Sequence, residues 1–208
     1  MESVAAKRYD QGMWGLENMG LRKLRRRMLG AVTGSVLEIG VGTGVNLGYY
    51  NGVDRVTAVD IHMGRLRGAA AKGMVHDTFP YAVNLADAQQ MPFAADQFDT
   101  VVGALVFCSI PDPAQALAEI QRVLKPNGRL LLLEHVRGQN PIARRLTDWL
   151  QPPWFALQHE CHLNRETKTA VSNAGFDIKS SSVHGFGVIQ LIEAAYPNNK
   201  YNPPANAQ

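Results

Sequence analysis

The sequence predicts an α/β fold with a doubly wound, mostly parallel sheet that helices cover on both faces. Short apolar runs of strand type alternate with runs of helical spacing along most of the chain. A glycine-rich turn follows the first apolar run, and a carboxylate ends the second. The 208 residues, 46% of them hydrophobic, are enough for one domain with a full core.

Each element follows from a local pattern of apolar residues and breakers. The expected strands lie at 35–40, 55–60, 81–86, 98–106, 129–135, 176–184 and 187–194. The expected helices lie near 44–50, 63–73, 113–124, 141–158 and 164–174. Asp112 and Pro113 make a cap and first turn for the third of these helices, and Asn127-Gly128 ends it. Two prolines and several aromatic residues make 141–158 unlike a plain crossover helix.

Composition divides the chain into three parts. Residues 1–33 are expected to form an N-terminal helical cap, and 34–195 the α/β domain. Residues 196–208 are rich in Asn and Pro and are expected to be disordered. Two cysteines give no disulfide framework, and the longest apolar run, 101–110, is shorter than the about 20 residues that a bilayer needs. We therefore expect a cytoplasmic protein.

Basic residues crowd into the cap just before the domain, although the whole chain carries a net charge of only +3. They are Arg22, Lys23, Arg25, Arg26 and Arg27. Leu21, Leu24 and Met28 recur among them at helical spacing, which predicts an amphipathic basic helix. Such a helix is either a solvated element docked by its leucines or a peripheral contact for anionic membrane. Nucleic acid is not an expected partner, because no interleaved aromatic and basic residues follow the cluster.

The glycine turn indicates a nucleoside site. Glycines at 40, 42 and 44 follow the run that contains Glu38, and Asp60 ends the next run about 20 positions later. Glycine lets a backbone turn tightly and approach a ligand where a Cβ would collide. At this separation an acidic side chain can accept hydrogen bonds from ribose hydroxyls. The alternative for Asp60 is a strand-end carboxylate that caps the following turn.

The residues around the turn select among nucleosides. A phosphate-binding loop ends in Gly-Lys-Ser/Thr, whereas this turn continues as Gly44-Val-Asn. Two observations argue against a dinucleotide. The third glycine of the dinucleotide fingerprint is missing from its expected position, and the negative charge of Glu38 would repel a pyrophosphate. A carboxylate suits a cationic or zwitterionic ligand without phosphate. S-adenosylmethionine (SAM) meets these conditions.

The pattern E-x-G-x-G-x-G at Glu38–Gly44 resembles motif I of the class I SAM-dependent methyltransferases. The segments 85–93, 96–102 and 122–133 resemble, in order, the later motifs of the methyltransferase type 11 group. The resemblance implies a Rossmann-like, seven-stranded sheet with one antiparallel strand near its C-terminal edge. It also implies SAM as cofactor and S-adenosylhomocysteine (SAH) as its product.

The resemblance assigns the donor site. The glycine turn would face the methionine and ribose, Asp60 the ribose diol, and Asp87 the adenine edge; for Asp87 the alternative is again a turn cap. The full set of expected cofactor contacts is Glu38, Gly40, Gly42, Thr43, Gly44, Asp60, Ile61, His62, Asp87, Ala88 and Leu105.

The acceptor side is expected to be apolar, because methyl transfer to a thiolate neutralises charge and is favoured where water is excluded. The aromatic stretch 149–155 is the candidate lid, with core packing as the alternative. His135, at the end of the fifth strand, is the candidate base, or else a residue that orders the next loop. The expected acceptor contacts are Tyr9, Trp14, Cys108, Trp149, Trp154, His159 and Arg165.

The cluster His159-Glu-Cys-His162 contains residue types that bind metals, but we expect no metal there. Adjacent residues on one turn cannot all point inward, and no second cluster in the sequence completes a tetrahedral site. Asn164 and Arg165 are expected to hold the lid segment or to meet a polar group of the acceptor.

The C-terminal part narrows the resemblance. Glu134-His-Val, the aromatic stretch and Cys161-x-Leu-x-Arg-Glu166 resemble methyltransferase-like proteins that S-methylate alkyl thiols at membranes. In that family a hydrophobic anchor stands where this chain has the basic helix. The expected function is methylation of a small apolar or amphipathic acceptor, first a thiol. Phospholipid amine N-methylation is the alternative, followed by quinone-type C-methylation or a non-catalytic SAM-binding module. The oligomeric state stays open.

Overall fold

The computed structural model describes residues 17–74, 78–158 and 161–197. Its strands are β1 (Gly34–Ile39), β2 (Val53–Asp60), β3 (Tyr81–Leu85), β4 (Phe98–Ala104), β5 (Leu124–His135), β6 (Asp177–His184) and β7 (Ile189–Ala195). Its helices are α2 (Arg22–Leu29), α3 (Met63–Met74), α4 (Pro113–Val123), α5 (Pro141–Gln158) and α6 (Thr167–Asn173). Short helical turns are η1 (Glu17–Leu21), η2 (Leu47–Tyr49) and η3 (Gly185–Gly187).

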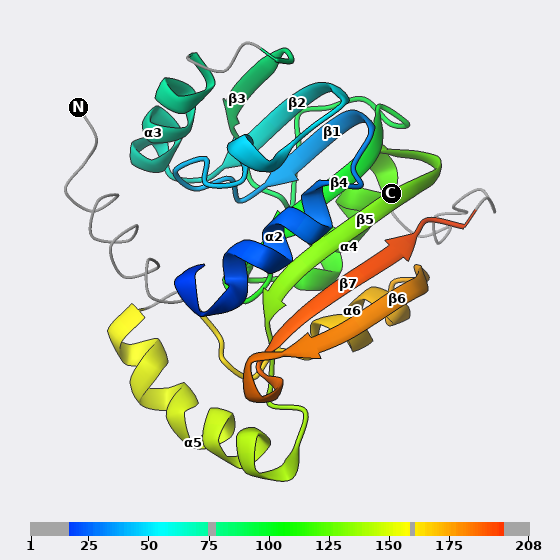
Figure 1. Cartoon of the computed structure of the whole chain (residues 1–208). Coiled ribbons are helices and arrows are strands. Elements are labelled where there is room, and N and C mark those ends of the chain that lie inside the picture. The colour runs from blue at the N-terminus through cyan, green and yellow to red at the C-terminus, as the bar shows by residue number, and fades with distance from the viewer. Residues whose placement is uncertain (1–16, 75–77, 159–160, 198–208) are drawn as a thin grey trace.

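The strands form one sheet in the order β3-β2-β1-β4-β5-β7-β6 (Figure 1). All neighbours pair in parallel except β7, which runs antiparallel to both β5 and β6. The predicted fold class is therefore confirmed. The chain proceeds outward from β1 to β3 and then crosses back to β4 on the other side of β1. This reversal creates a crevice at the carboxyl ends of β1 and β4, where ligands of such sheets bind.

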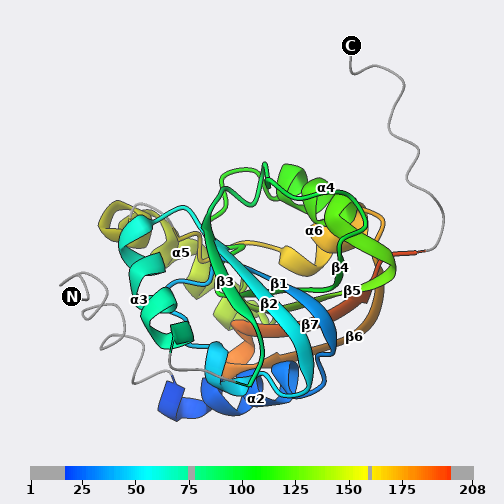
Figure 2. The ribbon, with the colours of Figure 1, turned by 90° about the horizontal axis from the view of Figure 1, so that it is seen from above.

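Helices cover both faces of the sheet (Figure 2). On β1, Val36 packs toward the face under α2 and Leu37 toward the face under α4, because successive strand residues point to opposite sides. The cap of α4 follows the sequence prediction, since Oδ1 of Asp112 accepts hydrogen bonds from the backbone N–H groups of Ala114 at 2.9 Å and Gln115 at 3.1 Å.

Two segments depart from the sequence prediction. The helix expected at 44–50 is wrong; the chain forms only the turn η2, because Asn46 is held by side chains from other elements and Gly48 disfavours a helix. Helix α5 continues through both of its prolines and projects beyond the carboxyl edge of the sheet instead of covering a face (Figures 1 and 2). Among the helices of the described residues, none is long and apolar enough to cross a bilayer.

Candidate active site

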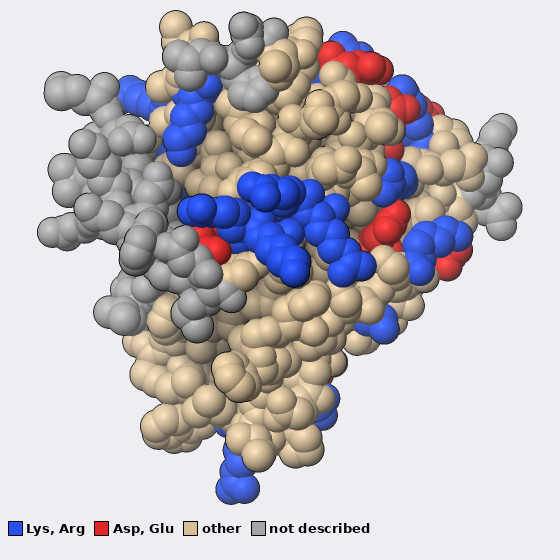
Figure 3. All heavy atoms as spheres, viewed as in Figure 1, with Lys and Arg blue, Asp and Glu red and all other residues tan. Residues whose placement is uncertain are grey.

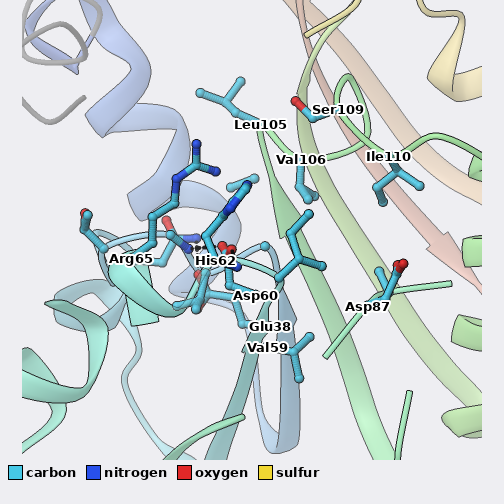
Figure 4. A pocket seen from close by; sticks show the side chains of 18 of the residues that line it. Glu38, Val59, Asp60, His62, Arg65, Asp87, Leu105, Val106, Ser109 and Ile110 are labelled. Carbon is cyan, nitrogen blue, oxygen red and sulfur yellow. Dashed lines mark hydrogen bonds between the residues drawn. The ribbon is translucent and has the colours of Figure 1, made fainter. Parts of the chain in front are cut away.

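A cavity of about 380 Å³ lies in the crevice at the carboxyl ends of β1, β2 and β4. In Figure 4, Glu38, Asp60, His62 and Arg65 gather at one side, and the 105–110 loop lies across from them. The lining also includes Arg25 from α2 and Phe155 from α5. The expected cofactor contacts that line it are Glu38, Gly40, Gly42, Thr43, Asp60, Ile61, His62, Asp87, Ala88 and Leu105.

The positions in the turn need glycine for different reasons, namely the backbone conformation and the contacts that a Cβ would make. Gly40 has a φ of 62°, and a Cβ there would lie 2.2 Å from Cγ2 of Val106, so the turn packs directly against the 105–110 loop. Gly42 has a φ of 56°, and no described residue lies within 4 Å of an added Cβ. Gly44 is not among the lining residues; its Cβ would lie 3.0 Å from Cα of Ala69 on α3. The closest approach at Gly40 is thus to protein, not to the cavity.

Asp60 joins the two walls of the donor side. Its Oδ2 accepts a hydrogen bond from Gly42 N at 2.9 Å, and its Oδ1 accepts one from His62 N at 2.8 Å. The carboxylate is nearly fully buried and still lines the cavity. Because an ionised carboxylate offers about four acceptor positions, these two hydrogen bonds leave room for one from a ligand. Asp60 therefore does cap the turn that follows its strand, and this role is compatible with a hydrogen bond to a ribose.

Glu38 lies at the bottom of the same side. Its Oε1 accepts a hydrogen bond from Asn46 Nδ2 at 2.9 Å, and its Oε2 accepts one from Tyr50 Oη at 2.8 Å. Burial raises the pKa of Glu38 to about 7, and both hydrogen bonds and the charge of Arg25 oppose that rise. Near neutral pH this carboxyl group is poised between its two charge states.

Arg25 is a site residue that sequence reasoning missed. It is buried, donates from Nη1 to Asn46 Oδ1 at 2.6 Å and pairs through Nε with Glu17 Oε1 at 2.8 Å. The signal was available, because Arg25 lies four residues after Leu21 and three before Met28, on the helix face that both of them bury. One cation of the basic helix therefore belongs to the cavity.

Glu134 holds the 105–110 loop in place. In the sequence it was noted only as the first residue of the Glu134-His-Val pattern. Its carboxylate accepts hydrogen bonds from the backbone N–H groups of Val106 and Phe107, both at 3.1 Å. Glu134 is fully buried, and this burial raises its pKa to about 8. Leu105, at a φ of 58°, donates its N–H to Leu133 O at 2.8 Å. These contacts fix the loop that forms the far wall.

Asp87 lies at the exposed end of the cavity (Figure 4). Its carboxylate accepts hydrogen bonds from the backbone N–H of Gln89 at 2.8 Å and from the Gln89 side-chain amide at 2.9 Å. The turn cap that sequence reasoning left open is therefore present here too. Ile61 is 58% exposed although it lines the cavity, which leaves an apolar side chain open beside Asp60.

The residues that line the acceptor side of the cavity are not the ones that the sequence suggested. The described lining residues there are Ser109, Ile110, Pro111, Phe155 and His162. The rings of Phe155 and His162 lie 4.7 Å apart at 31°, so the aromatic stretch reaches the cavity through Phe155. Trp149, Trp154, Cys108 and Arg165 are absent from that lining. Tyr9, Trp14 and His159 lie outside the described residues.

Arg165 holds the segment after α5 against the 105–110 loop. It donates from Nη2 to Ile110 O at 2.8 Å, while His162 N donates to Cys108 O at 2.8 Å. This is one of the two roles that the sequence suggested for Arg165. His135 does not line the cavity; burial lowers its pKa, and its Nδ1 has no hydrogen-bond partner among the described residues. Its role as a base stays a prediction.

The two cysteines meet behind the acceptor side. The nearby Cys108 thiol lowers the pKa of Cys161, and the same interaction, together with burial, raises the pKa of Cys108. Within the described residues, no group of three His, Cys, Asp or Glu side chains has the arrangement of a metal site. His159 and Glu160 of the cluster considered above are outside that set.

Known proteins resemble the chain over its central part. The sequence profile of the family described as Methyltransferase domain matches residues 37–132. Thiol S-methyltransferase TMT1B of Rattus norvegicus is 34% identical over 148 residues, which cover 68% of this chain and 59% of that protein. Phosphatidylethanolamine N-methyltransferase of Cereibacter sphaeroides is 30% identical over 139 residues, which cover 62% of this chain and 68% of that protein. The chain thus spans about three fifths of the length of the thiol S-methyltransferases that it matches.

Solved structures share the fold at low identity. The methyltransferase of a Haloferax volcanii complex with a methyltransferase activator has a TM-score of 0.75 at 19% identity, covering 96% of this chain and 97% of that one. The N-methyltransferase NodS of Bradyrhizobium japonicum, in complex with SAH, has a TM-score of 0.65 at 17% identity, covering 87% of each chain. Together with the profile and the relatives, these findings define the family. The chain belongs to the class I SAM-dependent methyltransferases.

Proposed function

We propose that this protein binds SAM in the cavity and transfers its methyl group to a small apolar or amphipathic acceptor, in the first place a thiol. The division of the cavity carries the proposal. Buried carboxylates and Arg25 lie on one side, and an apolar loop with Phe155 lies on the other. A zwitterionic donor suits the first side, and an uncharged acceptor suits the second.

The residues of the donor side fit SAM. Asp60, beyond its two backbone hydrogen bonds, offers its carboxylate to a ribose diol. Glu38 is placed to attract an ammonium group, and Arg25 a carboxylate. The volume of about 380 Å³ lies within the range of about 300–1,000 Å³ of small-molecule sites.

The protein's contribution to the reaction is to align the acceptor with the donor and to shield the reacting atoms from water. Bound SAM supplies a methyl group that its sulfonium already activates. With an acceptor bound, the 105–110 loop and Phe155 would shield the path of the attacking sulfur from water, which favours a step in which opposite charges neutralise. The new bond joins the thiolate sulfur to the methyl carbon, the old carbon–sulfur bond breaks, and its electron pair stays on the donor sulfur. The acceptor's proton passes to a base or to water before the attack, and His135 stays the predicted base although it does not line the cavity.

The similarity to thiol S-methyltransferase TMT1B supports a thiol acceptor. Among the described lining residues of the acceptor side, Ser109 and His162 supply the polar side chains, and none is a carboxylate that would hold an ammonium acceptor. Phospholipid amine methylation is the second candidate, because the Cereibacter sphaeroides relative is covered over 68% of its length.

The test is release of SAH with a panel of acceptors: an alkyl thiol, phosphatidylethanolamine vesicles, a quinol, and buffer alone. We expect turnover with the thiol, and none for Asp60→Ala at the same SAM concentration. A His135→Asn arm, measured across pH, tests the base. Turnover with only the amine lipid would replace the thiol by the second candidate. SAM binding without turnover on any acceptor would indicate a non-catalytic module.

A further inference from the structure

The side chain of His162 reaches the acceptor side of the cavity from the segment that follows α5. Its backbone N–H donates to Cys108 O at 2.8 Å, which attaches this segment to the 105–110 loop. The centroid of its ring lies 4.7 Å from that of Phe155 on α5, and the two rings are inclined by 31°. The loop and α5, which both border the cavity, therefore hold the imidazole in place.

Gln151 of α5 determines which ring nitrogen of His162 carries the proton. The backbone N–H of Leu163 can only donate, and it donates to Oε1 of Gln151. The group of Gln151 that faces Nδ1 of His162, at 3.2 Å, is therefore the amide Nε2, which has protons to donate. Nδ1 accepts this hydrogen bond, so the proton of a neutral imidazole lies on Nε2.

The surroundings of the ring also keep it uncharged. A second proton would have to sit on Nδ1, where it would face the amide protons of Gln151. Burial, and after it the charge of Arg165, lower the pKa of His162 below its ordinary value. A neutral imidazole is therefore the form expected at about pH 7. In this form Nε2–H is a hydrogen-bond donor without a charge.

This donor is open and lacks a protein acceptor. Within the described part of the chain, no residue accepts a hydrogen bond from Nε2 of His162. The unpartnered ring nitrogen of His135, by contrast, is buried. Ser109 supplies the other polar side chain of the described acceptor lining, and Ile110, Pro111 and Phe155 are apolar. A hydrogen bond from Nε2 to a bound acceptor would thus form in apolar surroundings, where it is stronger than in water.

A donor in this place distinguishes between classes of methyl acceptor. A thiolate sulfur has several lone pairs, so it can accept a hydrogen bond with one and attack the methyl group with another. A neutral amine has a single lone pair, which a hydrogen bond from Nε2 would occupy. A protonated amine has only protons to offer and finds no acceptor on this imidazole. The tautomer therefore favours an acceptor atom that attacks as an anion.

The charge of the neighbouring surface favours the same class. Arg22, Lys23, Arg26 and Arg27 are exposed on α2, and Figure 3 shows a continuous blue patch over that helix. Arg25 of the same helix lines the cavity, so α2 borders the site. A positive surface raises the local concentration of anions and favours the ionised form of a nearby thiol.

We propose that His162 binds the attacking atom of the acceptor, its Nε2–H donating a hydrogen bond to the thiolate sulfur, and that Gln151 is the positioning residue that keeps the proton on Nε2. The inference rests on the proposed function and adds the residue that recognises the acceptor. The sulfur–methyl bond forms while the donor's carbon–sulfur bond breaks, and its electron pair stays on the donor sulfur. Nε2 keeps its proton throughout, so His162 is not the base that receives the proton of the thiol.

The first test is nitrogen NMR of the imidazoles at about pH 7 in protein with isotope-labelled histidine, because the spectrum shows which ring nitrogen is protonated. The His162→Phe variant identifies the signal of His162 among the 6 histidines. We expect the wild-type proton on Nε2, and a shift of this signal when an alkyl thiol is added to the SAH-bound protein. Gln151→Glu keeps an oxygen for Leu163 N but turns the donor at Nδ1 into an acceptor, so it is expected to place a proton on Nδ1. A wild-type proton on Nδ1 would overturn the proposal.

The second test is turnover, measured as SAH release at about pH 7 with an alkyl thiol and with an aryl thiol. His162→Phe is expected to lower kcat/KM for the alkyl thiol about tenfold to a hundredfold, because that thiol depends on the hydrogen bond to ionise. The loss is expected to be smaller for the more acidic aryl thiol. His162→Gln, which retains an N–H donor, is expected to recover part of the activity. His184→Phe removes a histidine of β6 that does not line the cavity, and it is expected to behave like the wild type.

The outcomes separate this inference from the proposed function. All variants are expected to bind SAH with wild-type affinity, which shows that the donor side is folded. Thiol turnover that His162→Phe leaves unchanged would overturn the role of His162 and leave the proposed function standing. Equal losses for the two thiols would likewise refute the hydrogen bond to the thiolate. Wild-type turnover of phosphatidylethanolamine but of no thiol would refute the thiol acceptor itself, and the role of His162 with it.

Discussion

The backbone N–H of Gly42 donates to Oδ2 of Asp60 at 2.9 Å, which ties the glycine turn after β1 to the end of β2. The other carboxylate oxygen receives the N–H of His62 at 2.8 Å. One buried side chain therefore sets the distance between the two walls of the donor side before any ligand arrives. Pre-formed geometry of this kind reduces the ordering that binding requires.

Replacing Asp60 with Ala is expected to weaken SAH binding about tenfold to a hundredfold, because the ribose loses its acceptor and Gly42 N loses its partner. Isothermal titration calorimetry with SAH measures the effect. Asp54→Ala is the matched control, since Asp54 is exposed on the same strand. Equal affinities of the two variants would refute the assignment of Asp60.

The affinity for SAM is expected to depend on pH through Glu38. Its pKa of about 7 means that the carboxyl group is largely ionised above neutrality and largely protonated below it. Only the ionised form attracts the ammonium group of SAM strongly, so affinity is expected to fall as pH drops from about 8 to about 6. Glu38→Gln is expected to bind more weakly at about pH 8 and with a flatter pH profile. A wild-type profile as flat as that of the variant would contradict this role.

Stability is expected to fall with rising pH because of Glu134. Its pKa is about 8 in the folded protein and near 4.5 when unfolded, so its contribution is fully present below about pH 4.5 and lost as pH rises through about 8. Glu134→Gln is expected to flatten this fall in the free energy of unfolding by urea. In Glu134→Gln the decrease in the free energy of unfolding that remains comes from Glu38, and it should end near pH 7. Glu193→Gln, on the neighbouring strand β7, is the control and should keep the wild-type slope.

Loss of Arg25 is expected to destabilise the protein by about 2–4 kcal/mol, because Glu17 would remain in its pocket without a counter-charge. Arg26→Gln, one residue further on the exposed face of the same helix, is expected to change stability by less than about 0.5 kcal/mol. Urea denaturation of Arg25→Gln and Arg26→Gln compares them directly. Arg25→Gln is also expected to bind SAM more weakly, whereas unchanged stability and affinity would remove Arg25 from the site.

Cys161 is expected to react with iodoacetamide at a rate that rises with pH and is half-maximal at a lower pH than for an ordinary cysteine. Cys108→Ala removes the thiol that lowers the pKa of Cys161 most, so the midpoint should move to higher pH. Mass spectrometry of the alkylated peptide follows the reaction. A midpoint that Cys108→Ala leaves in place would mean that the two thiols do not interact.

The local patterns that determine the sheet were visible in the sequence. Gly40 and Asp60 follow from the runs around them, and all seven strands lie within a few residues of their expected places. The helix expected at 44–50 failed because Asn46 bonds Glu38 and Arg25, which local propensity does not contain. Hydrogen bonds to residues distant in the sequence therefore determine the conformation of 44–50.

The acceptor side was harder to predict, because its residues come from elements whose relative placement the sequence does not encode locally. Phe155 reaches the cavity while Trp149, two turns earlier, faces outward. Helical spacing alone shows that they lie on different sides, but not which side meets the domain. Glu134 was likewise hidden, since its partners are backbone N–H groups of another strand's loop.

Asp60 and the glycine turn are expected to hold a cofactor without phosphates in the cavity. Calorimetric titration of the wild-type protein with SAM, SAH, NAD and ATP tests it most directly. We expect saturable binding of SAM and SAH at one site, and no measurable heat from NAD or ATP at the same concentrations. Tight binding of NAD or ATP together with no binding of SAM would contradict it.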